Sequence, residues 1–314
     1  MDSTGTLFLP PGQSTIAPEV DALFNFILYT GIILFTIVVV GMAIFVVRYR
    51  RRGKEKPTTG SAQNLKLELA WTIIPTILVI IVFFWGFNIY LKMHVAPKDA
   101  FEITVTGQKW FWSFDYPSGA STVNDLVVPA GRPVKLLMSS KDVIHSFYVP
   151  DFRIKMDVLP NRYTMTWFEA PQPGEHNLFC AEYCGTSHSE MIGRVRVLGE
   201  REYAEWEQTS GSGGEGMSLE KYGEQLYTAK ACVTCHRIDG VAHTGPSFLG
   251  IYGESHPLAA GGTAVVDENY IRESILEPQS KVVAGYQPVM PTYQGLLDNR
   301  QVDALIAFIK SLKK

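Results

Sequence analysis

The sequence predicts a multi-domain membrane protein with a two-helix transmembrane hairpin, an all-β domain and an all-α domain. Three observations support this fold class. Two long stretches, Ala22–Val47 and Leu69–Leu91, contain no charged residue. Short alternating runs of polar and apolar residues then occupy 101–198, and amphipathic segments follow a stretch rich in glycine and serine. A chain of 314 residues is long enough for two or three such units.

The N-terminal part consists of an arm and the hairpin. Residues 1–20 contain three prolines and read as an irregular arm, and we assign 21–95 to the hairpin. At about 1.5 Å of rise per residue, each uncharged stretch can cross a hydrocarbon core of about 30 Å. Pro75 lies within the second span and predicts a bend or a local break there, because proline lacks the N–H that a helix needs.

The connection between the two spans is basic. Its positive residues are Arg48, Arg50, Arg51, Arg52, Lys54, Lys56 and Lys66. The positive-inside rule therefore places the connection on the cytoplasmic side and both termini outside; the alternative is a solvated charge run without topological meaning. The first 21 residues contain no Lys or Arg, so we expect no removable signal at this end.

Residues 96–208 change to the period of β-strands. The clearest strand patterns are 102–106, 134–138 and 194–197. Turn sequences rich in proline and glycine separate them, at 129–133 and 171–174. Many short strands separated by turn sequences indicate a β-sandwich or a small barrel.

The C-terminal part begins after a predicted tether. Residues 209–217 are mostly glycine and serine, which is typical of a flexible linker. We assign 218–314 to a helical domain, with helices expected at 219–229, 270–276 and 301–312. The last of these has four apolar residues on one face: Val302, Leu305, Ile306 and Ile309.

All four cysteines fall into two clusters, and the first resembles a copper site. Cys180 and Cys184 are followed by His188 and Met191, and His145 at the end of a distant strand supplies a further ligand. Thiolates, a thioether and imidazoles suit copper. Two thiolates are the complement expected when two copper ions share bridging sulfurs. The alternatives are a disulfide or a tetrahedral zinc site, neither of which needs Met191.

The second cluster is a haem-attachment motif. Cys232 and Cys235 have the spacing for two thioether bonds, and His236 follows as the proximal iron ligand. The alternative, a redox-active thiol pair, lacks the surrounding βαβ pattern of a thioredoxin-like domain.

The remaining features of this domain resemble class I cytochrome c. Residues 245–249 resemble the family's proximal loop and residues 289–293 its distal loop. The resemblance makes Met290 the sixth ligand, which raises the reduction potential of a haem. His243 and His256 are alternatives that would give a haem with two histidine ligands. Met217 lies in the linker and is excluded on that ground.

Residues 20–200 resemble subunit II of haem-copper cytochrome c oxidases. The resemblance rests on four segments: 68–75, 110–116, 142–147 and 180–191. It implies a cupredoxin-like Greek-key barrel with a binuclear copper centre, CuA, on the outer face of the membrane. The implied ligands are His145, Cys180, Cys184, His188, Met191 and the backbone carbonyl of Glu182.

The same resemblance implies three further roles. The Glu182 carboxylate would lie at a Mg site shared with subunit I, and Trp110 would lie where electrons enter the copper centre. Glu68 would lie at the cytoplasmic mouth of a proton channel in subunit I. Trp110 could instead pack the barrel, and Glu68 could be an ordinary polar residue at a helix end. Asp142 and Asp157 could be interface residues or surface charges.

Together the two resemblances imply subunit II of a caa-type oxidase, with a fused cytochrome c domain, in a bacterial cytoplasmic membrane. Electrons would pass from an external donor to haem c, then to CuA and to the haem-copper centre of subunit I, where oxygen is reduced to water with proton translocation. The donor could be a cytochrome c, an iron-sulfur protein or a neighbouring complex. None of the seven histidines lies within a span, so the oxygen-reducing site and its catalytic residues belong to a partner.

Two other readings remain open. A quinol oxidase subunit II would have lost copper ligands. A free-standing membrane-anchored carrier would need neither Glu68 nor Glu182. The expected partners are therefore subunit I, the other oxidase subunits, the external donor and membrane lipid. The net charge of −3 argues against nucleic acid.

Overall fold

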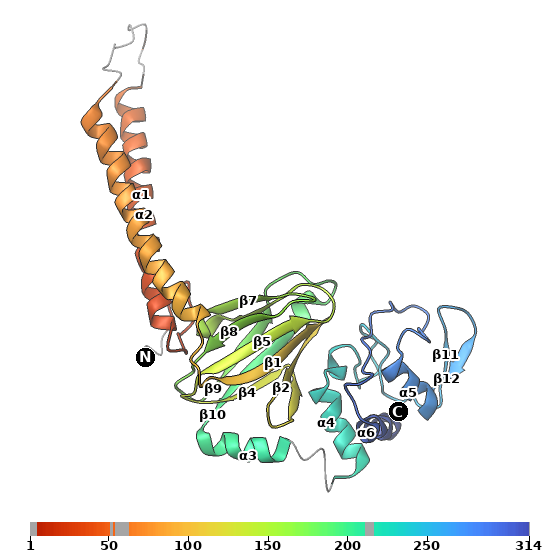
Figure 1. Cartoon of the computed structure of the whole chain (residues 1–314). Helices are drawn as coiled ribbons and strands as arrows, with labels where there is room; N and C mark the ends of the chain where they lie inside the picture. The colour runs from red at the N-terminus through yellow and green to blue at the C-terminus, as the bar shows by residue number, and fades with distance from the viewer. Residues whose placement is uncertain (1–4, 51–52, 54–62, 211–216, 314) are drawn as a thin grey trace.

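The computed structural model describes residues 5–50, 53, 63–210 and 217–313. Three parts follow one another in space in the same order as in sequence (Figure 1). A long helical hairpin projects from one end of a β-sandwich, and a smaller, mainly helical domain lies at the other end.

The hairpin consists of α1 (Ala17–Arg48) and α2 (Leu65–His94), so the last residues of the predicted arm are already helical. Both helices are long and apolar enough to span a membrane, and their most apolar windows are unburied within the chain. The predicted break at Pro75 is not found, because α2 continues through it. In an apolar environment every other backbone group still needs its helical partner, which favours continuation. Most of the predicted basic connection lies outside the described residues.

The middle domain is a sandwich of two five-stranded sheets, in the orders β3-β2-β1-β5-β8 and β4-β10-β9-β6-β7. The first sheet contains β1 (Phe101–Gln108), β2 (Phe111–Asp115), β3 (Ser121–Val123), β5 (Val134–Ser140) and β8 (Thr164–Phe168). The second contains β4 (Asp125–Pro129), β6 (His145–Val149), β7 (Ile154–Val158), β9 (Gly174–Cys180) and β10 (Ile192–Leu198). The pairs β1–β5 and β4–β10 are parallel, and the others are antiparallel. All three strand patterns recognised in the sequence are confirmed.

The core of the sandwich lies between the sheets. In strand β2, Trp112 and Phe114 are fully buried and contribute to this core, whereas Asp115 is exposed. The Trp112 ring meets Phe147 of the opposite sheet edge-on, with centroids 5.5 Å apart. Alternation with a period of two thus turns one face of each sheet inward, which is the basis of the sequence pattern.

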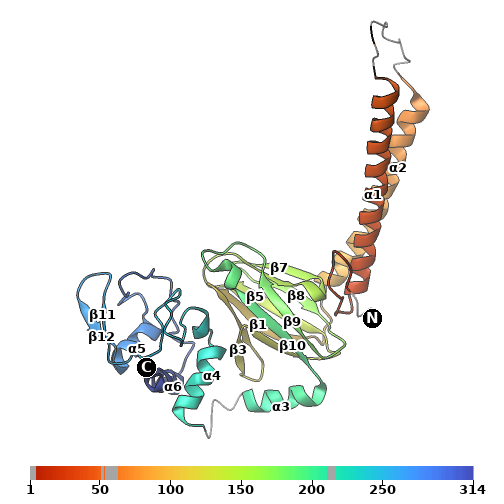
Figure 2. The ribbon, with the colours of Figure 1, turned by 180° about the vertical axis from the view of Figure 1, so that it is seen from behind.

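A helix that the sequence analysis did not anticipate, α3 (Glu200–Ser210), follows the last strand and lies along the lower side of the sandwich in Figure 2. Trp206 packs against Tyr116, with ring centroids 4.9 Å apart. The helix includes Thr209 and Ser210, which we had assigned to the linker. Residues 211–216 lie outside the described part of the chain.

The C-terminal domain contains α4 (Leu219–Ala229), α5 (Glu268–Leu276) and α6 (Asn299–Ser311), close to the predicted ranges. The predicted apolar face of α6 is buried. Helices α4 and α6 approach closely at Gly223, where a Cβ would lie 1.9 Å from the Ala304 carbonyl oxygen. A small hairpin of β11 (Ser255–Pro257) and β12 (Thr263–Val265) is an addition to the expected helices.

Candidate copper and haem sites

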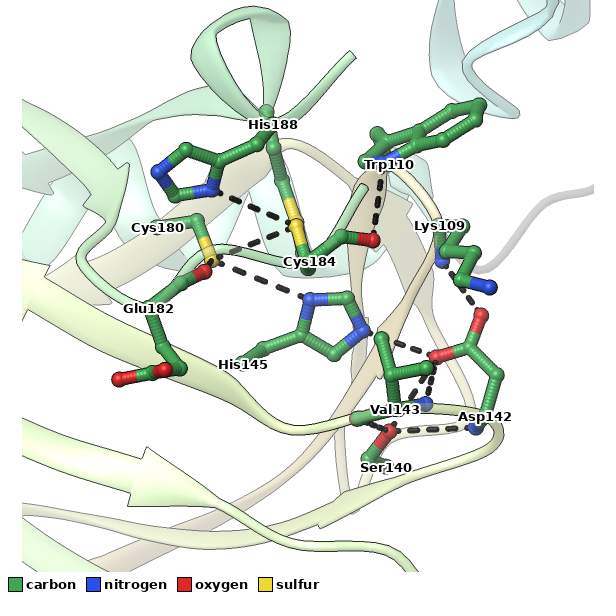
Figure 3. Close-up of polar contacts among 11 residues, drawn as sticks. Lys109, Trp110, Ser140, Asp142, Val143, His145, Cys180, Glu182, Cys184 and His188 are labelled. Carbon is green, nitrogen blue, oxygen red and sulfur yellow. Dashed lines mark hydrogen bonds and ion pairs between the residues drawn. The ribbon is translucent and has the colours of Figure 1, made fainter. Parts of the chain in front are cut away.

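Six potential ligand atoms lie close together at the ends of adjacent strands, and Figure 3 shows those of His145, Cys180, Glu182, Cys184 and His188. His145 begins β6, Cys180 ends β9, and Met191 comes directly before β10, so the ends of three adjacent strands bring them together. Cys184 and His188 lie in the connection between β9 and β10.

Short distances join these atoms into one cluster. The Cys180 Sγ lies 3.8 Å from the Cys184 Sγ, 3.8 Å from the His145 Nδ1 and 3.2 Å from the Glu182 carbonyl oxygen. The Cys184 Sγ lies 3.4 Å from the His188 Nδ1 and 3.8 Å from the Met191 Sδ. His145 and Met191 are fully buried. The five side chains and the carbonyl that the sequence analysis selected are therefore neighbours.

Asp142 orients the first histidine, a role that the sequence analysis missed. Its Oδ1 accepts a hydrogen bond from the His145 Nε2 over 2.9 Å, and its Oδ2 accepts one from the Lys109 backbone N–H over 2.8 Å. A carboxylate can only accept here, so the proton sits on Nε2 and the lone pair on Nδ1 faces the sulfurs. This role could have been inferred from the sequence, because Asp142 comes three residues before the ligand His145.

The two cysteine thiols of the cluster differ in acidity. Burial would raise the pKa of Cys180, but hydrogen bonds, chiefly with His145, outweigh burial and lower it to about 7. Burial and the neighbouring Cys180 charge raise the pKa of Cys184 to about 12. Two adjacent buried thiols resist becoming two thiolates unless a metal compensates the charge.

The set of donor atoms distinguishes a copper site from the two alternatives, a disulfide and a tetrahedral zinc site. Both cysteines are free thiols, so the disulfide alternative has no support. Six converging donors, one of them a thioether, exceed the four that a tetrahedral zinc site uses. Soft sulfur with imidazole nitrogen fits copper.

The haem motif occupies a turn after α4. His236 is buried, and its Nδ1 donates a hydrogen bond to the Pro246 carbonyl over 2.8 Å, which leaves Nε2 as the nitrogen with a lone pair. Burial lowers the pKa of His236, so the imidazole is neutral, as a metal ligand must be. A Cβ at Gly245 would lie 2.5 Å from the imidazole Cε1, so only glycine allows this close approach.

A cavity lies beside the motif. It is lined by all four predicted haem residues: Cys232, Cys235, His236 and Met290. His256 also lines it, and its Nδ1 is buried without a hydrogen-bond partner in the described structure. An unpartnered buried polar atom is costly unless a ligand satisfies it. His243 instead lines a separate pocket, and its Nε2 lies 3.6 Å from the Glu190 Oε1. This position argues against His243 as the sixth ligand.

Trp110 connects the two sites. Its indole Nε1 donates to the Cys184 carbonyl over 3.3 Å, and the residue also lines the haem cavity, together with its neighbours Lys109 and Phe111. Glu68, by contrast, lies in the first turn of α2 at the far end of the hairpin (Figure 1). The Glu182 carboxylate points away from the sulfur cluster, although its carbonyl faces Cys180 (Figure 3).

Family models match all three parts of the chain. Residues 3–89 match the transmembrane domain and residues 119–197 the periplasmic domain of "Cytochrome C oxidase subunit II", and residues 220–313 match "Cytochrome c".

Two relatives agree with the family matches. Cytochrome c oxidase subunit 2 of Alkalihalophilus pseudofirmus (strain ATCC BAA-2126 / JCM 17055 / OF4) is 31% identical over 317 residues, which cover 94% of this chain and 89% of that protein. The protein of the same description from Thermostichus vulcanus is 31% identical over 63% of this chain and 77% of its own length. A solved periplasmic domain of subunit II of cytochrome oxidase from Bradyrhizobium japonicum is 32% identical, covers 37% of this chain and 96% of that one, and gives a TM-score of 0.36.

A two-span anchor that carries a sulfur-rich cluster of metal-ligand side chains and a cytochrome c domain defines a membrane-bound electron-transfer subunit. The chain belongs to the cytochrome c oxidase subunit 2 family, and it carries a cytochrome c domain at its C-terminus. It is part of a haem-copper oxidase complex in a membrane and transfers electrons to that oxidase. Its His/Cys/Met cluster and its cytochrome c domain imply copper and haem c.

Proposed function

We propose that this chain receives electrons from an external donor on its cytochrome c domain and delivers them to subunit I from its β domain. When bound, a haem c and a binuclear copper group supply sites that each accept and release one electron. The chain's own residues hold these groups, set their distance and exclude water. The observation that carries the proposal is Trp110, which contacts the copper-site backbone and lines the haem cavity.

Six residues would hold the copper. They are His145, Cys180, Glu182 through its carbonyl, Cys184, His188 and Met191. The ends of adjacent strands hold three of them, His145, Cys180 and Met191, which limits their rearrangement when the oxidation state changes. Two sulfurs 3.8 Å apart support a pair of bridged ions rather than a mononuclear site.

Four residues would hold the haem. Cys232 and Cys235 would form the thioethers, His236 would be the proximal ligand and Met290 the distal ligand. The His236 ring stacks on Phe248, with centroids 4.4 Å apart and planes 16° from parallel, which limits its rotation. A covalent link keeps the haem in a domain that works outside the cytoplasm.

Trp110 would provide the shortest protein route between the two groups. It is only 4% exposed, so no water layer separates its indole from the Cys184 backbone. An aromatic ring that is hydrogen-bonded to the copper-site backbone and also lines the haem cavity shortens the through-space gap that an electron must cross. This geometry favours a role for Trp110 in electron transfer over a role in core packing alone.

Charged residues at the two ends of the hairpin support the proposed orientation. At the sandwich end, Lys92 pairs with Glu19 over 2.7 Å, and buried Arg153 pairs with Asp21 over 2.6 Å. At the far end, α1 finishes at Arg48. The sandwich and both termini would therefore lie outside the cytoplasm, as the positive-inside rule requires.

Two carboxylates would serve the contact with subunit I. Glu182, exposed beside the copper ligands, would place its carboxylate at a Mg site between the subunits. Glu68, at the cytoplasmic end of α2, would lie at the mouth of a proton channel in subunit I.

Metal and haem analysis of the purified oxidase tests the proposal. We expect one covalent haem c in this chain and an electron paramagnetic resonance spectrum of one unpaired electron shared by two copper nuclei. Cys180→Ser should remove that signal and keep the haem. Zinc in place of copper, or a signal from a single copper nucleus in the wild-type chain, would exclude the binuclear assignment.

A further inference from the structure

Strand β1 lacks a side chain at one of its inward-facing positions. Residues along the strand alternate between the two faces, and Ile103 and Val105 are fully buried in the core. Gly107 is the next inward-facing position, so the strand carries only a hydrogen atom there. A glycine inside a strand weakens it and often marks the close approach of another group.

The group that approaches Gly107 is the imidazole of His145. A Cβ at Gly107 would lie 3.1 Å from the imidazole Cδ2 and 3.4 Å from its Cγ. Carbon atoms in good contact are about 3.5–4.0 Å apart, so a side chain at this position would push the ring away. The His145 side chain is fully buried, which leaves the ring little space into which it could move.

The indole of Trp112 forms a second wall beside the same imidazole. Trp112 is the residue directly opposite Gly107 in the β1–β2 pair. Its ring meets the His145 ring edge-on, with centroids 5.9 Å apart. A Cβ at Gly107 would also lie 3.2 Å from the Trp112 Cζ3. The bare position in β1 therefore lets the indole and the imidazole meet.

Trp112 is a poor choice for core packing alone. The residue is fully buried, and its indole Nε1 has no hydrogen-bond partner in the part of the chain that the structure describes. A buried donor without a partner is destabilising, and phenylalanine would fill the core without one. Natural proteins usually break such packing rules at functional sites. The contact with His145 explains the large ring better than packing does.

Hydrogen bonds join the β1–β2 hairpin to the segment that carries His145. The Lys141 backbone N–H donates to the Gly107 carbonyl over 3.0 Å. The Asp142 carboxylate accepts from the His145 Nε2 over 2.9 Å and from the Lys109 backbone N–H over 2.8 Å (Figure 3). The two walls and the ring between them are thus held in one relative position.

We propose that Gly107 and Trp112 form a clamp that fixes the plane of the His145 imidazole and so keeps the unpaired electron shared between two copper ions. The clamp rests on the function proposed above, because it requires His145 to be a copper ligand. The Nδ1 lone pair lies in the ring plane, so a rotated ring would turn it away from the metal. Weaker ligation of one ion would make the two ions unequal and localise the electron. Gly107 and Trp112 are therefore positioning residues that act through His145.

Gly107→Ala in the intact oxidase tests the clamp, with Gly174→Ala as the matched control. A Cβ at Gly174 would lie 3.2 Å from the Nε2 of His176, a buried histidine of the same sandwich that bonds Asp151 and is no proposed ligand. Both variants thus crowd an imidazole, but only one imidazole faces the copper site. In Gly107→Ala the copper hyperfine pattern should change from that of two equivalent nuclei toward that of one, and copper affinity should fall by about ten-fold. The control should leave both nearly unchanged.

A second pair of variants makes the test independent of how well Gly107→Ala folds. Trp112→Phe removes the edge of the indole that walls in the imidazole and also removes the unpaired donor. Trp206→Phe is its control, because Trp206 packs against Tyr116 and contacts no proposed copper ligand in the described structure. We expect the hyperfine pattern to change in Trp112→Phe and to stay as in the wild type in Trp206→Phe. Haem c absorbance should be the same in all four variants.

A wild-type hyperfine pattern in both Gly107→Ala and Trp112→Phe would overturn the clamp, even if their unfolding midpoints fell, because that combination shows a packing role only. Equal changes in the test variants and their controls would overturn it as well. A wild-type oxidase without a two-copper signal would instead contradict the proposed function, which is a different result from either of these.

Discussion

At the scale of single residues, the hydrogen bond between Asp142 and His145 decides which imidazole nitrogen faces the sulfurs. Burial alone would lower the pKa of His145, but the bond to Asp142 outweighs it and raises that pKa. The same bond holds the ring in position for a metal. Loss of a hydrogen-bond partner that orients a metal ligand typically lowers metal affinity by about 10–100-fold.

We therefore predict that Asp142→Ala lowers copper affinity by about 10–100-fold, measured by competition with a chelator. Asp157→Ala is the control, since Asp157 bonds Ser146 and Lys155 and no proposed ligand. The hyperfine pattern of the copper signal should change only in Asp142→Ala. Equal affinities in the two variants would show that Asp142 does not position His145.

The sixth haem ligand is a second prediction at this scale, because Met290 and His256 both line the cavity. We expect Met290→Leu to abolish the methionine–iron absorption band and to lower the haem potential, since a thioether ligand raises it. His256→Leu should retain the band. The opposite pattern, with the ligand field lost only in His256→Leu, would assign the haem two histidine ligands.

At the scale of elements, the crossing of α4 and α6 depends on Gly223. A Cβ there would lie 1.9 Å from the Ala304 carbonyl oxygen and 2.7 Å from the Phe308 Cβ. Gly223→Ala must push the helices apart, and overpacking of this kind costs about 1–3 kcal/mol. We expect a lower guanidinium midpoint for the haem domain, followed by haem absorbance. Glu224→Ala, one residue along on the exposed side of α4, should leave the midpoint nearly unchanged.

The elements that could be predicted from the sequence are those with a strong local pattern. Helix α6 has an apolar face and an N-terminal capping box formed by Asp298 and Gln301, and its predicted range was nearly correct. Helix α3 was missed because it is mostly polar and buries only Tyr203. The β11–β12 hairpin has strands of three residues each, too short for alternation to be recognised.

At the scale of the whole molecule, the two sites differ in how much of them the sequence could reveal. The ligand residues were identifiable because sulfur and imidazole recur at diagnostic spacings. The contact between Phe111 and Tyr293 was not, because it joins two domains and no local sequence pattern indicates that these two residues meet. A pattern of period two even predicts that Phe111 faces solvent. Only the folded chain shows that another domain covers it.

Membrane orientation is the last prediction, and it follows from the two ends of the hairpin. The far end carries the basic residues Arg48 and Lys66, whereas Glu19 and Asp21 lie at the sandwich end, each paired with a cation. Positive charge is retained on the cytoplasmic side during insertion. A membrane-impermeant thiol reagent should therefore label Lys98→Cys in intact spheroplasts and Lys66→Cys only after permeabilisation. Both positions are exposed, and the four native cysteines would be occupied by copper and haem. The reverse labelling pattern would place both redox domains in the cytoplasm, where no external donor could reach them.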